Sequence, residues 1–410
     1  MNQPFLIFGG TCLVPPANTD DNWIITDLIL NGSVIGRLGV EDGPLQTGTS
    51  SPERTFDASG LLILPGIVDI HGDAFERQIQ PRPRTLFAHD IALADTDRQL
   101  AANGITTACH GVTYSWEGGL RGRAAALALM AAVDAQRLQA QVDHRIHLRF
   151  ENHHIDGLAD VLAWIAAGRI DFLTFNEHLP GIAAKSAAID KMAAYAERAR
   201  CDLAAFMQRL QQAQARGAEV EQIIEKIAAA CRAHGIPMAS HDDMTHTERE
   251  RYADLGVAVS EFPRTEDALF AAVALDNPVI MGAPNVLLGG SHCGGLATAA
   301  AVASGMCDIL ASDYYYPSML HAPFALAQAG VCCLAEAWRL VSVHPAQALG
   351  LTDRGLIATG QRADLLLVQA PAGNAAGAAP RLIATIAAGR LAYCVEPERL
   401  SLRQLAATAA

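Results

Sequence analysis

The sequence of 410 residues contains little charge and very little lysine. Only 18% of its residues are charged and 51% are hydrophobic, which excludes an intrinsically disordered chain and predicts a large buried core. The formal net charge of -13 is spread along the chain and argues against a general nucleic-acid or membrane-surface binder. An anionic small-molecule ligand is still compatible with it, because a few arginines and metal ions can make one cleft positive.

Paired cysteine motifs and long apolar segments are also lacking. The nine cysteines are scattered and none falls in a C-x-x-C pattern, which predicts reduced thiols in a cytoplasmic protein. The N-terminus is a poor signal peptide, because no Lys or Arg precedes its short apolar stretch, and no uninterrupted apolar segment would span a bilayer. We expect a cytoplasmic protein that binds a small molecule and neither nucleic acid nor membrane. A homo-oligomer is left open.

Both ends of the chain show the pattern of short β-strands separated by Gly, Asp, Asn and Pro. The candidate strands are 5–8, 23–30, 33–38, 355–357, 364–368, 382–387 and 391–395. Residues 370–380 are low in complexity and predict a surface loop. We expect residues 1–62 and 346–410 to pair into one small β-sandwich domain.

Residues 63–345 alternate strand-like and helical patterns. Helical spacing is clearest in 122–139 and 157–168. The eight strand candidates are 67–71, 105–110, 145–151, 171–178, 236–241, 257–262, 279–283 and 308–313. Eight strands with crossover helices predict an α/β fold of the (β/α)8 TIM-like type.

The segment of about 183–234 is too long for an ordinary connection in such a barrel. It is interpreted as an insert of two helices with a break at Gly217. Plain packing is the favoured role of this insert. A lid or an oligomer contact is the alternative.

His71 and Asp73 follow the apolar run 61–70, which predicts a strand buried on both faces. Because side chains alternate along a strand, the two residues point the same way. An imidazole and a carboxylate at the carboxyl end of a buried parallel strand are typical of a metal site in a barrel enzyme. A buried His hydrogen-bonded to a neighbouring Asp explains the pair equally well.

Other predicted strands also end in a side chain that binds metals. Each is a weak signal alone, since a single His more often caps a core hydrogen bond. Together the six residues would emerge at one face of the barrel, and six nitrogen and oxygen donors suit two divalent ions better than one. Zn²⁺ is the first expectation, with Mn²⁺ or Fe²⁺ as alternatives. The predicted ligands are His71, Asp73, Glu151, His178, His241 and Asp313.

Four segments carry a resemblance to the amidohydrolase superfamily. They are Leu-Pro-Gly-Ile-Val-Asp-Ile-His at 64–71, Asn-Gly-Ile-Thr-Thr at 103–107, His-Pro-Ala-Gln-Ala-Leu at 344–349 and Gly-Gln-Arg-Ala-Asp-Leu at 360–365. Barrel hydrolases of this type often bridge their metals with a carboxylated lysine. The three lysines of this sequence all lie in the helical insert, so Glu151 is the predicted bridging ligand.

Narrower motifs resemble the family of α-D-ribose 1-methylphosphonate 5-triphosphate diphosphatases. They are His-Gly-Asp-Ala-Phe-Glu-Arg at 71–77, Pro-Arg-Pro-Arg at 81–84, Ser-His-Asp-Asp at 240–243, Met-Gly-Ala-Pro-Asn at 281–285, Gly-Gly-Ser-His at 289–292 and Ser-Asp-Tyr-Tyr at 312–315. The resemblance implies hydrolysis of a ribose 5-triphosphate ester to the 5-phosphate and pyrophosphate in phosphonate degradation. Gly72, Ala74 and Cys293 depart from the family pattern, so a paralogue acting on a related substrate is an alternative.

The hypothesis that follows divides the ligands between two ions. One ion takes His71, Asp73 and Asp313. The other takes His178 and His241, with Glu151 bridging. Coordination would lower the pKa of a shared water, and Asp313 would act as the general base that takes its proton before attack on phosphorus.

Further residues are predicted to contact the anionic substrate. Arg149 is the best-placed cation, and His292 is predicted to donate to the leaving pyrophosphate. The predicted substrate contacts are Arg77, Arg82, Arg84, Arg149, His246, Gly290, Ser291 and Tyr314. Plainer alternatives are a solvated loop for Arg82 and Arg84, a simple turn for the glycines at 289–290, and a structural role for the two histidines.

Two other functions stay open. The same metal site would also suit hydrolysis of a C–N bond, in a cyclic amide, an N-acyl compound or a deamination. The two are distinguished by anion binding, which a diphosphatase site needs and an amidase pocket does not. A non-catalytic barrel scaffold is the less favoured alternative, because it predicts degraded ligands and all six are present.

Overall fold

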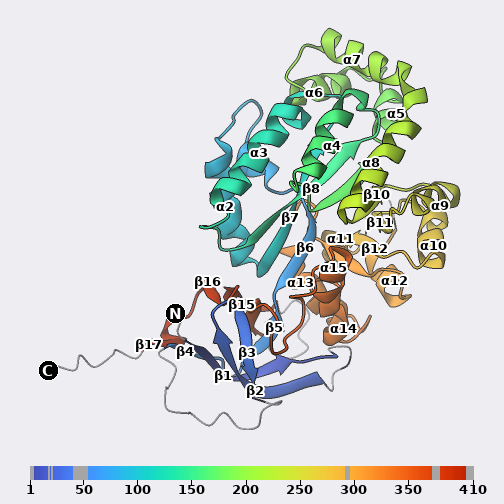
Figure 1. The fold of residues 1–410 in the computed structure, drawn as a ribbon. Helices are drawn as coiled ribbons and strands as arrows, with labels where there is room; N and C mark the ends of the chain where they lie inside the picture. Colours follow the sequence, from blue (N-terminus) through green and yellow to red (C-terminus); the bar gives the residue numbers. More distant parts are fainter. Residues whose placement is uncertain are drawn as a thin grey trace.

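The computed structural model describes residues 4–16, 19, 22–39, 54–290, 296–371 and 379–402. Two sheets organise them, one rolled into a barrel and one built from both ends of the chain (Figure 1). The barrel strands are β6 (Ile67–Gly72), β7 (Ile105–Tyr114), β8 (Asp143–Glu151), β9 (Phe172–Asn176), β10 (Met238–His241), β11 (Val259–Glu261), β12 (Val279–Gly282) and β13 (Ile309–Ala311). All eight predicted barrel strands are present, in sequence order and parallel.

The barrel closes between its first and last strands at the carboxyl end. The backbone N–H of Asp313 donates to the carbonyl oxygen of His71 at 3.0 Å, and the N–H of Asp73 donates to the carbonyl oxygen of Asp313 at 2.9 Å. A parallel bridge between Gly72 and Asp313 results. Two predicted ligand segments are thereby joined through their own backbone.

Helices surround the barrel and cover the apolar outer faces of its strands (Figure 1). The predicted helical stretches 122–139 and 157–168 correspond to α3 and α4. The helices are α1 (Glu76–Ile79), α2 (His89–Ala102), α3 (Arg123–Gln136), α4 (Leu158–Ala166), α8 (Val220–His234), α9 (His246–Asp254), α10 (Glu266–Ala274), α11 (Ala283–Leu288), α12 (Thr298–Ala303), α13 (Ser318–Gln328), α14 (Leu334–Arg339) and α15 (Val343–Ala348). No helix within the described ranges has both the length and the apolar character needed to cross a membrane.

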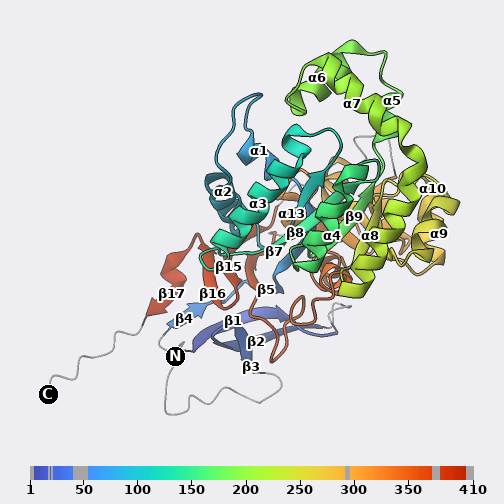
Figure 2. The same ribbon diagram turned by 45° about the horizontal axis from the view of Figure 1, so that its top comes forward.

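The helical insert differs from the two helices that the sequence predicts. It contains α5 (Leu179–Ala183), α6 (Ile189–Arg198) and α7 (Leu203–Ala215), which share a small core of their own and extend beyond the barrel (Figure 2). The unpredicted break lies before α7, where Arg200 has φ +54° and the Asp202 side chain caps the new helix. The break at Gly217 is confirmed, and α8 beyond it packs against α4 in the barrel's core.

The second sheet is mixed and has nine strands from both chain ends. Its strands are β1 (Phe5–Leu13), β2 (Trp23–Asn31), β3 (Val34–Leu38), β4 (Arg54–Asp57), β5 (Leu62–Pro65), β14 (Leu365–Gln369), β15 (Arg381–Ala387), β16 (Arg390–Cys394) and β17 (Leu400–Leu402). It branches at β1, because β4 and β5 pair with successive parts of the same edge. The predicted fold class was a TIM-like barrel with a small β-sandwich domain from both chain ends, and the barrel and a mixed sheet built from both ends are confirmed.

Two expectations for this sheet need correction. Residues 355–357 form no strand, because Gly355 has φ +91°, and a Cβ at this position would lie 2.8 Å from Cα of Val343. The apolar run 61–70 is divided at Gly66 between β5 and β6, which belong to different sheets. A side chain at Gly66 would collide with Thr106 and lie 2.9 Å from Cβ of Asp364. The predicted loop 370–380 lies largely outside the described residues.

Candidate metal centre

The centre is built around Glu261, a fully buried carboxylate at the end of β11. Its Oε1 lies 2.7 Å from Nδ1 of His71, and its Oε2 lies 2.8 Å from Nδ1 of His241. One carboxylate thus fixes two imidazoles from β6 and β10, whose rings are 5.8 Å apart and nearly parallel. Because both histidines contact Glu261 through Nδ1, Nε2 is the atom that each would offer to an ion, although Nε2 of His241 lies 3.1 Å from Nη2 of Arg149 in this structure.

The charges at this centre are set by burial and by the partners of each group. Burial opposes ionisation of Glu261, but His71 and His147 together with the hydrogen bonds hold its pKa well below the usual range. Burial, reinforced by the neighbouring Arg149, lowers the pKa of His241 to about 4. His241 is therefore neutral near pH 7, which is the state in which an imidazole binds a metal.

Within the part of the chain that the structure describes, three groups of side chains bring donor atoms within 4.8 Å of one another. The groups are His71 with Asp73 and Asp313, His178 with His241 and Asp242, and His71 with His147 and Glu261. The first two reproduce the division of five predicted ligands between two ions. The five side chains meet at one mouth, and their role as ligands stays a prediction.

The backbone at this mouth is unusual at three positions after strand ends. Asp242, Phe262 and Asp313 have φ of +64°, +55° and +53°. Non-glycine residues rarely adopt this region, and the cost is of order 1–3 kcal/mol each. The turn at Phe262 sets its ring at 5.0 Å from that of His71 and 5.6 Å from that of His241, so that it packs on both imidazoles.

Glu151, the predicted bridging ligand, does not enter these groups in the structure. Its Oε1 accepts hydrogen bonds from the backbone N–H of His178 at 2.9 Å and of Leu179 at 3.3 Å. Its Oε2 lies 3.0 Å from Nδ1 of His178. The buried carboxylate thus orients His178 at the start of α5. Its bridging role stays a prediction.

Arg149 lies between the two ligand groups. Its Nη2 is 3.1 Å from Nε2 of His241, and its Nη1 is 3.6 Å from Oδ2 of Asp73. The side chain is buried, and a Cβ at Gly111 on the adjacent β7 would lie 3.2 Å from its Cδ. The absence of a side chain at Gly111 therefore leaves the arginine room to lie across the mouth.

The donor set fits divalent ions. It consists of imidazole nitrogens and carboxylate oxygens without sulfur, as expected for Zn²⁺, Mn²⁺ or Fe²⁺. Several buried polar atoms on neighbouring strands have no hydrogen-bond partner among the described residues, namely Nδ1 of His147, Nε of Arg149 and both amide atoms of Asn176. Buried polar groups normally have hydrogen-bond partners, so these unpartnered atoms suit the binding of a polar ligand nearby.

Other predicted substrate residues lie on the surrounding loops. Arg77 donates through Nη2 to the carbonyl oxygen of Tyr314, so these two predicted residues meet. Arg82 and Arg84 lie on an exposed turn, and Nε of Arg84 is 3.1 Å from Glu197 of α6. His246 starts α9 and lies 3.2 Å from Glu250. Neither the turn nor His246 belongs to the three donor groups.

Predicted contacts of the glycine-rich segment can be placed only in part. The N–H of Gly290 donates to the carbonyl oxygen of Asn285 at 3.1 Å, just after α11. Ser291 and His292 lie outside the described residues, as does Cys293. Their predicted roles stay predictions.

Sequence reasoning missed Glu261, His147 and Asp242. Glu261 is the last residue of β11 and alternates with buried Val259, so the rule applied to the other strands would have found it. His147 lies on the same face of β8 as Arg149 and Glu151, so the alternation of side chains would have indicated it as well. Asp242 lies in the Ser-His-Asp-Asp motif directly after His241.

The comparisons with known proteins agree with this geometry, although no protein-family model matches the sequence. The α-D-ribose 1-methylphosphonate 5-triphosphate diphosphatase of Escherichia coli (strain K12) is 34% identical over 353 residues, which are 83% of this chain and 93% of that protein. Two solved structures show the same fold. An amidohydrolase from a Sargasso Sea environmental sample has TM-score 0.63 at 15% identity, over 95% of this chain and 93% of that chain. The dihydropyrimidinase of Brevibacillus agri NCHU1002 has TM-score 0.54 at 14% identity, over 95% and 94%. Together with the barrel and its buried His, His and Glu cluster, these similarities show that the chain belongs to the amidohydrolase superfamily and is a hydrolase of that superfamily.

Proposed function

We propose that this hydrolase is a metal-dependent diphosphatase of phosphonate degradation. Its substrate would be a ribose 5-triphosphate ester of the α-D-ribose 1-methylphosphonate 5-triphosphate type, and its products the 5-phosphate and pyrophosphate. The similarity to the E. coli diphosphatase suggests this reaction. The observation that carries the proposal is Arg149, 3.1 Å from His241 and 3.6 Å from Asp73, because phosphoryl transfer requires cations around the reacting phosphate.

We propose two divalent ions, with zinc first and manganese or iron as alternatives. His71, Asp73 and Asp313 would hold one ion, and His178 and His241 the other. Bound there, the ions would supply a water of lowered pKa and positive charge for the phosphoryl oxygens. Glu261 would keep the Nε2 atoms of His71 and His241 directed at the ions through the hydrogen bonds of 2.7 and 2.8 Å.

The residues of the chain would then carry the proton and the charge. The carboxylate of Asp313 takes a proton from the attacking water. The water oxygen bonds to the α-phosphorus while the bond from that phosphorus to the bridging oxygen breaks, and pyrophosphate leaves with this oxygen. Arg149 donates to the non-bridging oxygens, which gain charge in the transition state, and His292 donates to the leaving pyrophosphate.

Pyrophosphate release by the full chain tests this proposal. With zinc or manganese added, we expect release from ribose 5-triphosphate. Asp313→Asn should lower kcat by about 100- to 10,000-fold, the usual contribution of a general base, while zinc content is largely kept. The matched control is Asp254→Asn, on the exposed end of α9, which should leave kcat unchanged.

The same preparation distinguishes C–N hydrolysis. Dihydrouracil and N-acyl amino acids test the cyclic amidase and deacylase alternatives. Turnover of one of these, with no pyrophosphate release and no inhibition by pyrophosphate, would replace the diphosphatase proposal.

A further inference from the structure

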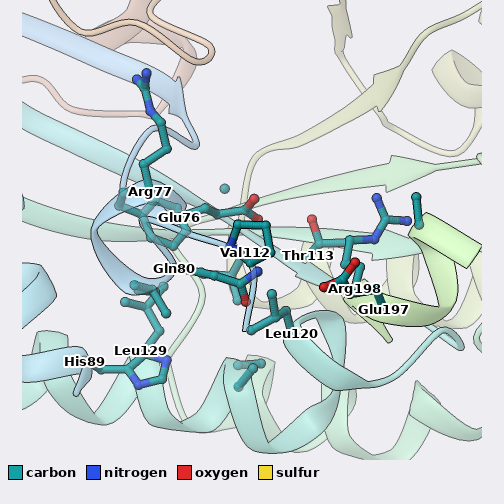
Figure 3. Close-up of a pocket in the computed structure, with 17 residues that line it drawn as sticks. Glu76, Arg77, Gln80, His89, Val112, Thr113, Leu120, Leu129, Glu197 and Arg198 are labelled. Carbon is teal, nitrogen blue, oxygen red and sulfur yellow. The ribbon is translucent and has the colours of Figure 1, made fainter. Parts of the chain in front are cut away.

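A cavity of about 370 Å³ lies against β7, the strand next to the one that carries Arg149 (Figure 3). Its size is within the range of about 300–1,000 Å³ that small-molecule sites occupy. Its floor is formed by Gly111 to Thr113 of β7, and the position of a Cβ at Gly111 lies within 4 Å of both Arg149 and Asp73. The backbone of β7 at Gly111 therefore lies between the cavity and the side chains of Arg149 and Asp73.

The walls of this cavity are mainly apolar. They come from α1 with its flanking residues, α3, and the insert helix α6, which contributes Ala194, Glu197 and Arg198. The apolar lining includes Phe75, Ile79, Val112, Leu120 and Leu129. The insert thus forms one wall of a cavity at the mouth of the barrel, in addition to packing on its own core.

The few polar groups of the cavity are not suited to a triphosphate. Two of them are carboxylates, Glu76 and Glu197. Arg198 is paired with the buried carboxylate of Glu117, and Arg77 donates to the carbonyl oxygen of Tyr314. Burial lowers the pKa of His89, so this imidazole adds no charge near pH 7.

Glu76 and Gln80 are instead suited to hydroxyl groups. They lie four residues apart at the two ends of α1, and the N–H of Gln80 donates to the carbonyl oxygen of Glu76 at 2.8 Å. Figure 3 shows the carboxylate of Glu76 and the side chain of Gln80 on the side of Val112, whereas Arg77 extends away from them. A carboxylate accepts hydrogen bonds from two hydroxyls, and an amide can donate and accept.

We propose that this cavity holds the furanose ring of the substrate with its vicinal diol, and that Glu76 accepts hydrogen bonds from the diol. This inference rests on the proposed diphosphatase function. The triphosphate would lie across Arg149 and the ligand groups, while the sugar enters between α1, α3 and α6. The α6 wall then contributes to selecting a sugar triphosphate over a bare polyphosphate.

Calorimetric binding of two probes to the full chain tests the proposal. Ribose 5-phosphate carries the sugar, and inorganic tripolyphosphate carries only the anion. Glu76→Ala removes the acceptor, and Ala194→Trp fills the cavity from the exposed face of α6. The matched control is Ala193→Trp, an exposed neighbour on the same helix that does not line the cavity.

We expect both cavity variants to weaken ribose 5-phosphate binding by about 10- to 100-fold, the range for lost hydrogen bonds to a charged group. Tripolyphosphate binding should change by less than about twofold, and the control should bind both probes like the wild type. Equal affinity for ribose 5-phosphate in the control and both cavity variants would overturn the proposal.

The two proposals fail in different ways. Hydrolysis of ribose 5-triphosphate with an unchanged KM in Ala194→Trp would overturn the sugar cavity and leave the diphosphatase function standing. Binding of ribose 5-phosphate that depends on Ala194, in a chain that cleaves no triphosphate, would support the cavity and overturn the function.

Discussion

Replacing Glu261 by Gln tests the arrangement of the metal centre most directly. Each carboxylate oxygen of Glu261 has one imidazole partner, at 2.7 Å in His71 and 2.8 Å in His241. An amide offers one acceptor oxygen and one donor nitrogen. One of the two histidines must therefore accept at Nδ1 and carry its proton on Nε2, where it can no longer bind an ion.

The expected magnitude follows from this change of tautomer. Loss of a hydrogen-bond partner behind a ligating histidine typically costs about 10- to 100-fold in metal affinity. We expect at least one zinc to bind Glu261→Gln that much more weakly, while the fold is kept, because the amide fills the same volume. Turnover should fall in parallel at limiting zinc and recover in part at high zinc.

Competition with a chromophoric chelator measures the zinc affinity and stoichiometry. Circular dichroism checks the fold of the metal-free variant. The control is Glu225→Gln on the exposed face of α8, which should bind zinc like the wild type. Wild-type zinc affinity and stoichiometry in Glu261→Gln would refute the assignment of Glu261 as the residue that orients both imidazoles.

Three more predictions concern packing, pH and anion binding. Gly66→Ala should lower the free energy of unfolding by about 1–3 kcal/mol, because the added methyl group would collide with Thr106. The control Gly181→Ala places its methyl group in open space and should not lower it. Urea denaturation measures both variants. Burial lowers the pKa of His154 to about 4, below its value of about 6.5 in the unfolded chain. Between these two pH values the unfolded chain binds more protons than the folded one. The free energy of unfolding therefore falls as the pH falls through this range. Urea denaturation at a series of pH values should show a weaker fall in His154→Phe, and an identical pH dependence would contradict this origin. Arg149→Met should raise the inhibition constant of pyrophosphate at least about tenfold, because the proposed contact with the anion is lost. Zinc affinity should not fall, because the variant releases Nε2 of His241 from its contact with the guanidinium. Unchanged inhibition would exclude Arg149 from the anion site.

Local pattern predicted most of the barrel, because several of its strands are short apolar runs that end at or just before a polar residue. The strand ending in Glu151 and the one ending in His241 are both predicted in this way. His241 belongs to a donor group, whereas Glu151 contacts His178 of that group instead of joining it. The division of the run at Gly66 was not predictable from hydrophobicity, since both halves are buried. It depends on the close approach of Thr106 and Asp364.

Which side chains contact each other within the site could be predicted less well than which residues belong to the site. Contact between Glu261 and His71 joins residues 190 positions apart, and nothing local in either strand specifies it. The carboxylate of Glu151 was predicted to bridge ions, whereas in the structure its oxygens contact the backbone and ring of His178, two residues beyond β9. Side-chain identity indicates which groups bind ions, but the path of the loop decides which of them touch.

The bridge between Gly72 and Asp313 closes the barrel at the same place where the side chains of Asp73 and Asp313 meet. The first and last strands of the barrel, β6 and β13, are connected there by the backbone of Asp313, whose side chain is a predicted ligand. A chain that ends before Asp313 would lack these backbone hydrogen bonds and one member of the group formed with His71 and Asp73. Closure of the barrel and completion of that donor group therefore depend on the same backbone contact.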